Sequence, residues 1–519
     1  MDLLLPGTKE MPMNTTKAIF GVLKITFGLT GRICTSSLVP LLSLLLMLSV
    51  SGAQAAVVFT SLYSFTGGND GANPEAGLVQ GRDGNFYGTT SDWDTHGYGT
   101  VFKISTSGVL TTLYAFGTIT NANGDPLDGA NPLAGLVQGS DGSFYGTTSG
   151  FYRGYGTVFT ITTNGTLTVL HSFTGGSDGG APLAGLVEGS DGCFYGTAAV
   201  GGTEGRGTVF KISPAGALTS LYSFGGNGAQ PEAGLVQGSD GNFYGTTLID
   251  GVHFQPYGFG TVFKISPYGA CTVFYSFDNG GGACSMAGLV QGSDGYLYGT
   301  TSGSSCSCGY GWGTVFKISP TGALTSLHSF AGGSDGGAPL AGLVQGSDGC
   351  FYGTTSSGGI TNFNFFTGTY GCGTVFKIST NGVLTTLYAF GSIINASGEA
   401  LGVQPYAALV QGSDGNFYGT TFDGGKFTNQ YGRGNGTVFR LAIVPPPQLS
   451  IIPSGPHMIL TWPTDYNGIS YAGCSLQSTT NLGPSAVWAT NSPAPVVING
   501  QNVVTNPITG TQQFYRLSQ

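Results

Sequence analysis

The sequence predicts an all-β protein whose body is a seven-bladed β-propeller of four-stranded blades. One cassette, A-G-L-V-Q-G-S-D-G-x-F-Y-G-T-T followed by G-T-V-F-K-I-S and L-T-x-L-Y-S-F, recurs between Val57 and Ile443. Its Asp-Gly pair and its Gly-Thr-Val-Phe segment each occur seven times, at Asp-Gly spacings of 49 to 66 residues. Repetition of one supersecondary unit at such a period is typical of propellers and other repeat architectures.

Each cassette contains four short segments rich in Val, Ile, Thr, Tyr and Phe, which Gly, Asp, Asn and Pro separate. This composition predicts strands joined by turns, and no segment has a helical period. The Asp-Gly pair suits a tight hairpin turn with positive φ between the first two strands. Pairs such as Asn164-Gly165, Thr321-Gly322 and Asn381-Gly382 are expected to join the third strand to the fourth.

The two ends of the repeat region complement each other. Residues Phe59 to Phe65 form a fourth strand with no cassette before it, and the last cassette stops after its third strand, Gly436 to Leu441. We therefore predict that the N-terminal strand completes the last blade and closes the propeller, which hides an exposed sheet edge. The alternative is an open β-solenoid.

Four regions follow from composition. Residues 1–55 are predicted to be a signal peptide, since basic side chains up to Arg32 precede an apolar run from Leu38 to Val50 and then Ala53-Gln54-Ala55. That run is shorter than a membrane span needs, and the alternative, an uncleaved anchor, stays open because the charged region before it is unusually long. Residues 56–444 form the propeller and 445–447 a proline linker. Residues 448–519 read as a small C-terminal β-sandwich that resembles fibronectin type III modules.

Charge and cysteine content exclude some functions. The net charge is −9, only 8% of residues are charged, and no basic run is present, so nucleic acid is not an expected partner. Cys193 and Cys350 occupy one repeat position and are expected to be unpaired thiols. A bridge among Cys306, Cys308 and Cys372 stays open, and no metal site or cofactor is predicted.

The cassette resembles the GloVer-type tandem-repeat family of exported bacterial proteins, typified by D-G-x-F-Y-G-T-T followed by G-T-V-F. The match covers residues 57 to 443, with few departures such as Ala198 and Leu297. The resemblance implies export to the medium or the cell surface and C-terminal modules, of choice-of-anchor type, that differ between members. It supplies no catalytic residues.

The two faces of the propeller are expected to differ. The first-to-second and third-to-fourth turns share one face and are short and nearly constant, whereas the second-to-third loops and the blade connections share the other face and vary in length. Aromatic side chains gather in the variable loops, where they could stack on sugar rings, grip a protein or pack on one another. The candidate ligand-binding residues are Trp93, Tyr98, Phe151, Tyr152, Tyr257, Tyr310, Trp312, Phe366, Tyr370 and Tyr431, with Phe427 on the same face.

The function predicted from the sequence is a non-catalytic, exported binding or surface-interaction protein whose partner is a polysaccharide or an envelope protein. Two alternatives remain. One is a propeller glycan hydrolase or lyase that uses loop acids, and the other is a structural component of the cell envelope. The loop acids are Asp92, Asp94, Glu204, Asp250 and Asp423. The aspartates of the blade connections, such as Asp178 and Asp335, are expected to cap their own turns rather than to bind calcium.

Overall fold

The computed structural model describes residues 23–24 and most of residues 56–518. The gaps within 56–518 are 92–96, 151–153, 227, 250–258, 278–283, 304–310, 361–370, 393–399, 429–433, 446, 467–468, 472–473, 481–485, 492 and 508–512. The chain divides into two compact units, of which one is Phe59–Ala442 and the other comprises Met1–Val58 and Ile443–Gln519. Nearly all of the predicted signal peptide lies outside the described residues.

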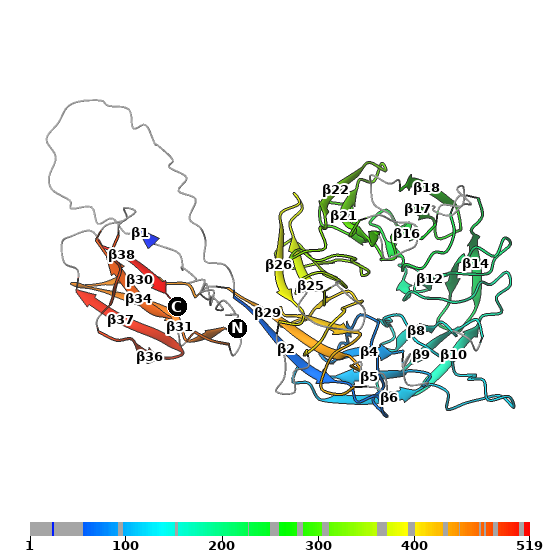
Figure 1. Ribbon diagram of the computed structural model, residues 1–519, viewed down its shortest axis with the longest axis horizontal. Helices are drawn as coiled ribbons and strands as arrows, with labels where there is room; N and C mark the ends of the chain where they lie inside the picture. The colour runs from blue at the N-terminus through cyan, green and yellow to red at the C-terminus, as the bar shows by residue number, and fades with distance from the viewer. Residues whose placement is uncertain are drawn as a thin grey trace, which may run out of the picture. The chain divides into compact units, whose positions relative to one another are not determined.

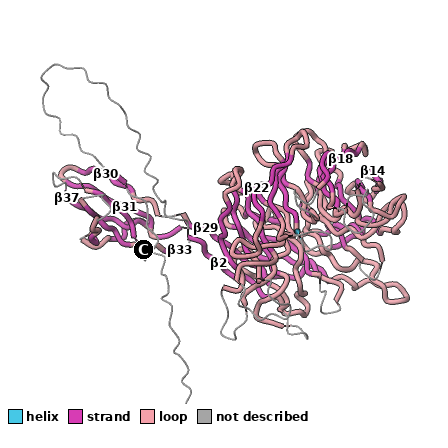
Figure 2. Tube along the Cα trace, turned by 45° about the horizontal axis from the view of Figure 1, so that its top comes forward, coloured by secondary structure: helices cyan, strands magenta, loops and turns pink. Residues whose placement is uncertain are grey.

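The compact unit that contains the repeats consists of seven four-stranded antiparallel sheets that follow one another around a centre (Figures 1 and 2). The strands of the first four sheets are β3 (Val79–Gln80), β4 (Phe86–Thr90), β5 (Thr100–Ile104), β6 (Leu110–Ala115); β7 (Val137–Gln138), β8 (Phe144–Thr148), β9 (Thr157–Ile161), β10 (Leu167–Ser172); β11 (Val187–Glu188), β12 (Phe194–Ala198), β13 (Thr208–Ile212), β14 (Leu218–Ser223); β15 (Val236–Gln237), β16 (Phe243–Thr247), β17 (Thr261–Ile265) and β18 (Cys271–Ser276). The strands of the last three are β19 (Val290–Gln291), β20 (Leu297–Thr301), β21 (Thr314–Ile318), β22 (Leu324–Ser329); β23 (Val344–Gln345), β24 (Phe351–Thr355), β25 (Thr374–Ile378), β26 (Leu384–Ala389); β27 (Val410–Gln411), β28 (Phe417–Thr421), β29 (Thr437–Val444) and β2 (Ala56–Ser64). The all-β propeller architecture predicted from the cassettes is confirmed.

The N-terminal strand β2 is the outer strand of the seventh sheet, where it pairs with β29. Just after β2, the N–H of Phe65 donates to the Gly436 carbonyl at 3.1 Å. Phe116 and Gly99 make the same bond within the first sheet, at 3.0 Å. The first strand therefore occupies the position that a fourth strand has in every other sheet, as the incomplete last cassette predicted.

Hydrogen bonds between neighbouring sheets repeat seven times. The donor is the main-chain N–H of the residue two positions after the short inner strand of one sheet. The acceptor is a side-chain oxygen of the Gln or Glu that ends the inner strand of the next sheet. The seven pairs are Arg82 with Gln138, Ser140 with Glu188, Ser190 with Gln237, Ser239 with Gln291, Ser293 with Gln345, Ser347 with Gln411, and Ser413 with Gln80, at 2.8 to 3.1 Å. The last of these pairs joins the seventh sheet to the first.

The Phe-Tyr pair of the cassette explains how the sheets pack. Successive residues of a strand point to opposite faces, so the two rings enter the two neighbouring interfaces. The Tyr145 ring lies 3.9 Å from that of Phe194 in the next sheet, and both side chains are buried with Phe210 and Ile212. Seven such interfaces place the hydrophobic core between the sheets, not on the two faces of the ring.

The Asp-Gly turns have the predicted geometry in all seven cassettes. Their glycines have φ between 74° and 88°, in the left-handed region that glycine adopts without a steric penalty. In the third cassette, Asp191 accepts the Cys193 N–H at 3.1 Å and the Tyr195 hydroxyl at 2.8 Å. The cassette aspartate thus holds the turn and orients the Tyr of the next strand.

The recurring strand lysines complete some of these turns. Lys211, Lys264 and Lys377 lie 2.6 to 2.7 Å from the carboxylates of the aspartates of their own cassettes. Burial alone would raise the pKa of Asp191, but the hydrogen bonds from Lys211, Tyr195 and the Cys193 N–H outweigh burial and lower it. The pKa values of Tyr145 and Tyr195 rise to about 12, because both phenols are partly buried and donate to a carboxylate.

These shifts predict a stability that falls at both ends of the pH range. The pKa is lowered for Asp83, Asp191, Asp240, Asp348 and Asp414. Their contribution is present above pH about 4, the ordinary aspartate value, and is lost as the pH falls through the folded pKa values. The tyrosines contribute below pH about 10 and lose that contribution as the pH rises toward 12.

Urea unfolding followed between about pH 2 and pH 12 would test this expectation, with Tyr195→Phe as the matched variant. That variant should lose less stability at alkaline pH than the wild type, because it has no phenol to ionise. A free energy of unfolding that stays constant from pH 6 to pH 2 would contradict the role given to the aspartates.

Several described cysteines are free thiols. Cys193 and Cys350 are free thiols, as predicted, and so is the buried Cys372. Cys284 is disulfide-bonded.

Asp178, in the connection between the second and third blades, caps its own turn as expected. Its carboxylate accepts the Thr174 N–H at 2.9 Å and lies 3.1 Å from the ring Nε2 of His171.

The C-terminal unit contains two antiparallel four-stranded sheets and one short pair. The first sheet has the order β30 (Ser450–Ser454), β31 (His457–Pro463), β37 (Gln501–Pro507) and β36 (Val496–Ile498). The second has the order β1 (Leu23–Lys24), β38 (Phe514–Ser518), β34 (Ser475–Thr479) and β35 (Ala489–Thr490), and β32 (Asp465–Tyr466) pairs with β33 (Ile469–Ser470). Alternate side chains of β31 are buried, among them Leu460 and Trp462. The likeness to fibronectin type III modules stays a prediction.

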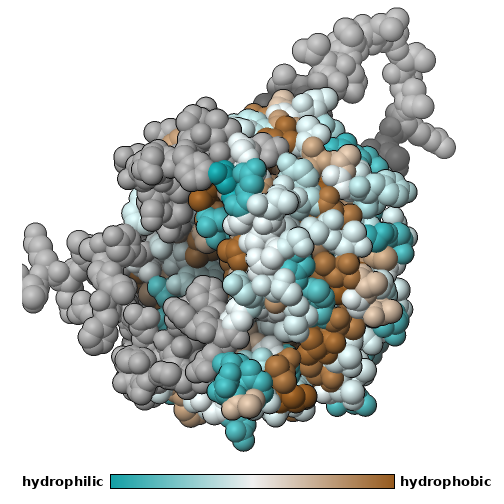
Figure 3. All heavy atoms as spheres, turned by 90° about the vertical axis from the view of Figure 1, so that its right-hand side faces the viewer, coloured by the Kyte–Doolittle hydropathy of each residue, from teal (hydrophilic) through white to brown (hydrophobic). Residues whose placement is uncertain are grey.

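In the described part of the chain, no helix is both long and apolar enough to cross a membrane. Weakly polar residues cover most of the described surface that faces the viewer in Figure 3, and hydrophobic side chains form small groups among them. This appearance agrees with a composition in which charged residues are only 8% of the chain.

Candidate functional site

The loops that connect the second and third strands differ strongly among the blades. Residues 149–156 separate β8 from β9, whereas residues 356–373 separate β24 from β25. The turns on the opposite face are constant, as residues 81–85 and 139–143 illustrate. The contrast between a constant and a variable face, which the sequence predicted, is present in the structure.

One position of the variable loop has the same backbone role in all seven blades. The residue immediately before Gly-Thr-Val-Phe accepts, through its carbonyl, a hydrogen bond from a non-glycine residue of the following blade connection. That donor has φ between 49° and 60°, a conformation that L-residues rarely adopt. The donor and acceptor pairs are Asn73 with Asn435, Asn131 with Tyr98, Ala181 with Tyr155, Gln230 with Arg206, Cys284 with Phe259, Ala338 with Trp312, and Gln404 with Cys372, at 2.7 to 3.1 Å.

Tyr98 and Trp312, two of the predicted ligand-binding residues, occupy this repeated position. A Cβ atom added at Gly117 would lie 2.1 Å from the Tyr98 ring, and one added at Gly332 would lie 2.2 Å from the Trp312 indole. Both rings are half-buried and pack against hydrophobic clusters between sheets. The structure therefore places each of these two rings over a glycine turn and against a sheet interface, and not against one another.

The other eight predicted ligand-binding residues lie outside the described residues. They are Trp93, Phe151, Tyr152, Tyr257, Tyr310, Phe366, Tyr370 and Tyr431. Asp92, Asp94 and Asp250, three acids of the enzymatic alternative, lie there too. The remaining two acids belong to different sheets: Glu204 is exposed, 3.8 Å from Arg206, and Asp423 is buried beside β28.

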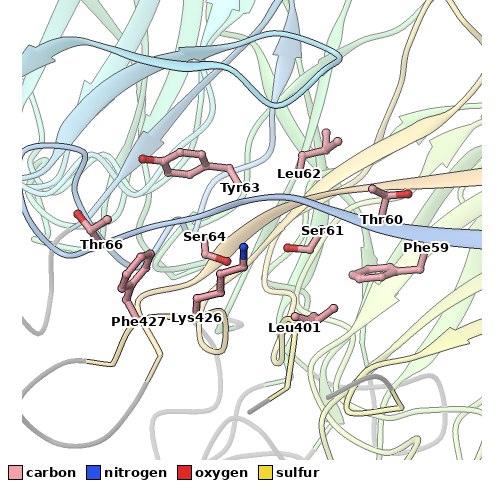
Figure 4. Close-up of a pocket in the computed structure, with 10 residues that line it drawn as sticks. All are labelled: Phe59, Thr60, Ser61, Leu62, Tyr63, Ser64, Thr66, Leu401, Lys426 and Phe427. Carbon is pink, nitrogen blue, oxygen red and sulfur yellow. The ribbon is translucent and has the colours of Figure 1, made fainter. Parts of the chain in front are cut away.

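A cavity of about 750 Å³ lies along the outer strand of the seventh sheet (Figure 4). Its lining residues are Phe59, Thr60, Ser61, Leu62, Tyr63, Ser64, Thr66, Leu401, Lys426 and Phe427. They come from β2, from the start of the connection that follows it (Thr66), from the connection between the sixth and seventh sheets and from the variable loop after β28. The sequence predicted only Phe427 among them as a candidate ligand-binding residue, because nothing marks the others as site residues until β2 pairs with β29.

The two ends of this cavity are aromatic. Phe59 is held in place by stacking on Tyr388 of β26, with ring centroids 4.2 Å apart and planes 2° apart. Phe427 is 45% exposed, which leaves much of its ring open for a ligand. In Figure 4 the two rings stand at opposite ends of the row of β2 side chains.

Polar groups line the space between the rings. The hydroxyls of Thr60, Ser61 and Ser64 lie along β2, and the exposed Lys426 points its amine toward that strand (Figure 4). At the far end Tyr63 donates to Asp70 at 2.9 Å, which fixes the start of the first connection. Aromatic rings with interspersed hydroxyls and one ammonium group suit a polar, ring-shaped ligand.

Metal binding has no support in the part of the chain that the structure describes. No group of three or more His, Cys, Asp or Glu side chains there is arranged to hold a metal ion. The connection aspartates are engaged in their own turns, as described for Asp178.

Comparison with known proteins identifies the repeats. The Gloeobacter/Verrucomicrobia repeat matches residues 50–189, 149–366 and 283–445. Among curated proteins, none matches the sequence.

Solved structures resemble the chain at low sequence identity. A gluconolactonase from Xanthomonas campestris has 12% identity and a TM-score of 0.36, over 60% of this chain and 85% of the other. A luciferin-regenerating enzyme has 12% identity and a TM-score of 0.36, over 75% and 95%. A puromycin hydrolase has 13% identity and a TM-score of 0.42, over 77% and 60%. At such values these structures carry no inference about activity.

Proposed function

The chain belongs to the Gloeobacter/Verrucomicrobia repeat family, and on that premise we propose that it is an exported, non-catalytic binding protein that holds a saccharide at its variable loop face. Export is supported by the apolar run from Leu38 to Val50 and the small residues Ala53-Gln54-Ala55 that follow it. The constant parts of the cassette are engaged in turns and sheet interfaces, so variation between blades is concentrated in the loops.

The cavity along β2 is the observation that carries the proposal. It places the partly exposed Phe427 ring, the Ser61 and Ser64 hydroxyls and the Lys426 amine around about 750 Å³, a volume within the usual range for small-ligand sites. Sugars offer apolar C–H faces to aromatic rings and hydroxyls to polar side chains. Binding rather than catalysis is proposed for this cavity because neither of the two described loop acids, Glu204 and Asp423, lines it.

A glycan-array screen of the purified chain would test the proposal, with Phe427→Ala as the variant and Tyr268→Ala as its control. Tyr268 is 93% exposed in the turn between β17 and β18, on the constant face. We expect saccharide binding by the wild type, weakened roughly tenfold or more in Phe427→Ala and unchanged in Tyr268→Ala.

The absence of any glycan binding by the folded wild type would overturn the saccharide proposal and favour an envelope protein as partner. Release of a shortened or unsaturated glycan product would overturn the non-catalytic part and restore the hydrolase or lyase alternative.

A further inference from the structure

The repeat itself supplies an internal comparison for the cavity beside β2. Three variable loops contain a Gly-Gly pair with the same main-chain bond to the preceding blade connection. The N–H groups of Gly202, Gly359 and Gly425 donate to the carbonyls of Gly176, Gly333 and Ala400 at 2.8 to 3.0 Å. The residues after these pairs, Thr203, Ile360 and Lys426, are therefore structurally equivalent.

The outer-strand residue opposite this position is also equivalent in the three blades. A Cβ atom added at Gly202 would lie 2.3 Å from the side chain of Ser223. The corresponding distance is 3.4 Å from Gly359 to Ala389 and 3.3 Å from Gly425 to Ser64. Each of these three residues ends the outer strand of its sheet. The same backbone arrangement thus carries a different pair of side chains in each of the three blades: one residue after the Gly-Gly pair and one at the end of the outer strand.

The pair in the third blade is satisfied internally. The Thr203 N–H donates to the Ser223 hydroxyl oxygen at 2.7 Å, and the Thr203 hydroxyl lies 3.1 Å from it. The sixth blade pairs the neutral Ile360 with Ala389. Only the seventh blade of these three places an ammonium group, that of Lys426, opposite a serine hydroxyl.

Lys426 differs from three of the strand lysines in its surroundings. Lys211, Lys264 and Lys377 each lie 2.6 to 2.7 Å from a carboxylate oxygen. No described carboxylate lies within ion-pair distance of Lys426, whose side chain is exposed and lines the cavity. In a chain of net charge −9, an ammonium group with no carboxylate partner among the described residues, beside hydroxyls and an aromatic ring, favours an anionic ligand.

We propose that the cavity between β2 and the Lys426–Phe427 loop binds an acidic saccharide, with a uronate carboxylate at Lys426 and a sugar ring against Phe427. This inference rests on the proposed function and adds the ligand class to it. The Ser61 and Ser64 hydroxyls line the same space and are available for hydrogen bonds to sugar hydroxyls. A saccharide fits these groups better than an acidic peptide, which needs no aromatic platform.

The test compares a galacturonate trisaccharide with its fully methyl-esterified form, which has the same sugar rings but neutral ester groups in place of carboxylates, by calorimetric titration of the full chain. We expect tighter binding of the acid form, with an affinity that falls as salt is raised. Lys426→Thr, which copies the third blade, should weaken binding of the acid form about tenfold or more and leave the ester unaffected. Phe427→Ala should weaken both.

The controls separate this inference from the proposed function. An unchanged thermal midpoint of Lys426→Thr is expected, because the side chain is exposed and threonine occupies the equivalent place in the third blade. Equal affinity for acid and ester, or insensitivity to Lys426→Thr, would overturn the acidic-ligand inference and leave saccharide binding intact. Tighter binding of a glutamate-rich peptide than of the acid trisaccharide would overturn the ligand class, and failure to bind any glycan would overturn both.

Discussion

A chain that lacks Ala56–Phe65 should fail to form a stable seven-bladed propeller. Strand β29 would lose its outer partner, and an unpaired sheet edge would be exposed. Phe65, which is completely buried and whose ring lies 5.3 Å from that of Phe102, would leave a void between the seventh and first sheets. Circular dichroism and analytical ultracentrifugation should report lost cooperativity and aggregation.

A milder variant gives a measurable value. Phe65→Ala should lower the free energy of unfolding by about 3–5 kcal/mol, the usual cost of removing a buried Phe side chain. The control is Val109→Ala, at a residue that is 68% exposed, with an expected change within about 0.5 kcal/mol. A synthetic peptide of residues 56–65 added to the shortened chain should restore part of the cooperativity. A shortened chain as stable as the wild type would show that β2 is dispensable.

Gly185→Ala should destabilise the ring, whereas Gly234→Ala should be tolerated. A Cβ atom at position 185 would lie 2.8 Å from the Gly135 carbonyl oxygen of the preceding sheet, and backbone would have to move. At position 234 the corresponding distance, to the Gly185 carbonyl oxygen, is 3.5 Å, an ordinary contact. The two glycines occupy the same position of the cassette. The comparison therefore tests the distance to the neighbouring sheet and not the type of residue.

Urea unfolding of both variants would measure the difference. We expect a loss of about 1–3 kcal/mol for Gly185→Ala, the usual cost of overpacking, and a change within about 0.5 kcal/mol for Gly234→Ala. Ala408 already occupies the equivalent position of the seventh blade, so the ring has room for a methyl group at some positions. Equal effects of the two substitutions would contradict the importance of these inner contacts.

Much of the fold could be predicted because the repeat supplies the same evidence seven times. The Asp-Gly pair predicted a turn with positive φ, and the structure has that turn in every cassette. The incomplete last cassette predicted the place of β2, since strand count alone required a partner for β29. Local chemistry and counting were sufficient for these elements.

The candidate site was harder to predict, because its residues are not distinctive in the sequence. Tyr98 and Trp312 appeared to be variable loop aromatics, although alignment on the following Gly-Thr-Val-Phe would have shown that they share one repeat position. Their carbonyls hold residues with positive φ in the next connection, a contact that loops of unequal length conceal.

The sequence by itself determined the seven cassettes, the turns within them and the need for the first strand to complete the last sheet, because each of these depends on neighbouring residues or on counting. Only the tertiary structure decided that Ser61 and Ser64 lie beside Lys426 and Phe427. Those two pairs are more than 360 positions apart in the chain, and they meet because β2 crosses to β29 to bury the edge of the last sheet. A site that depends on such long-range pairing leaves no local pattern in the sequence.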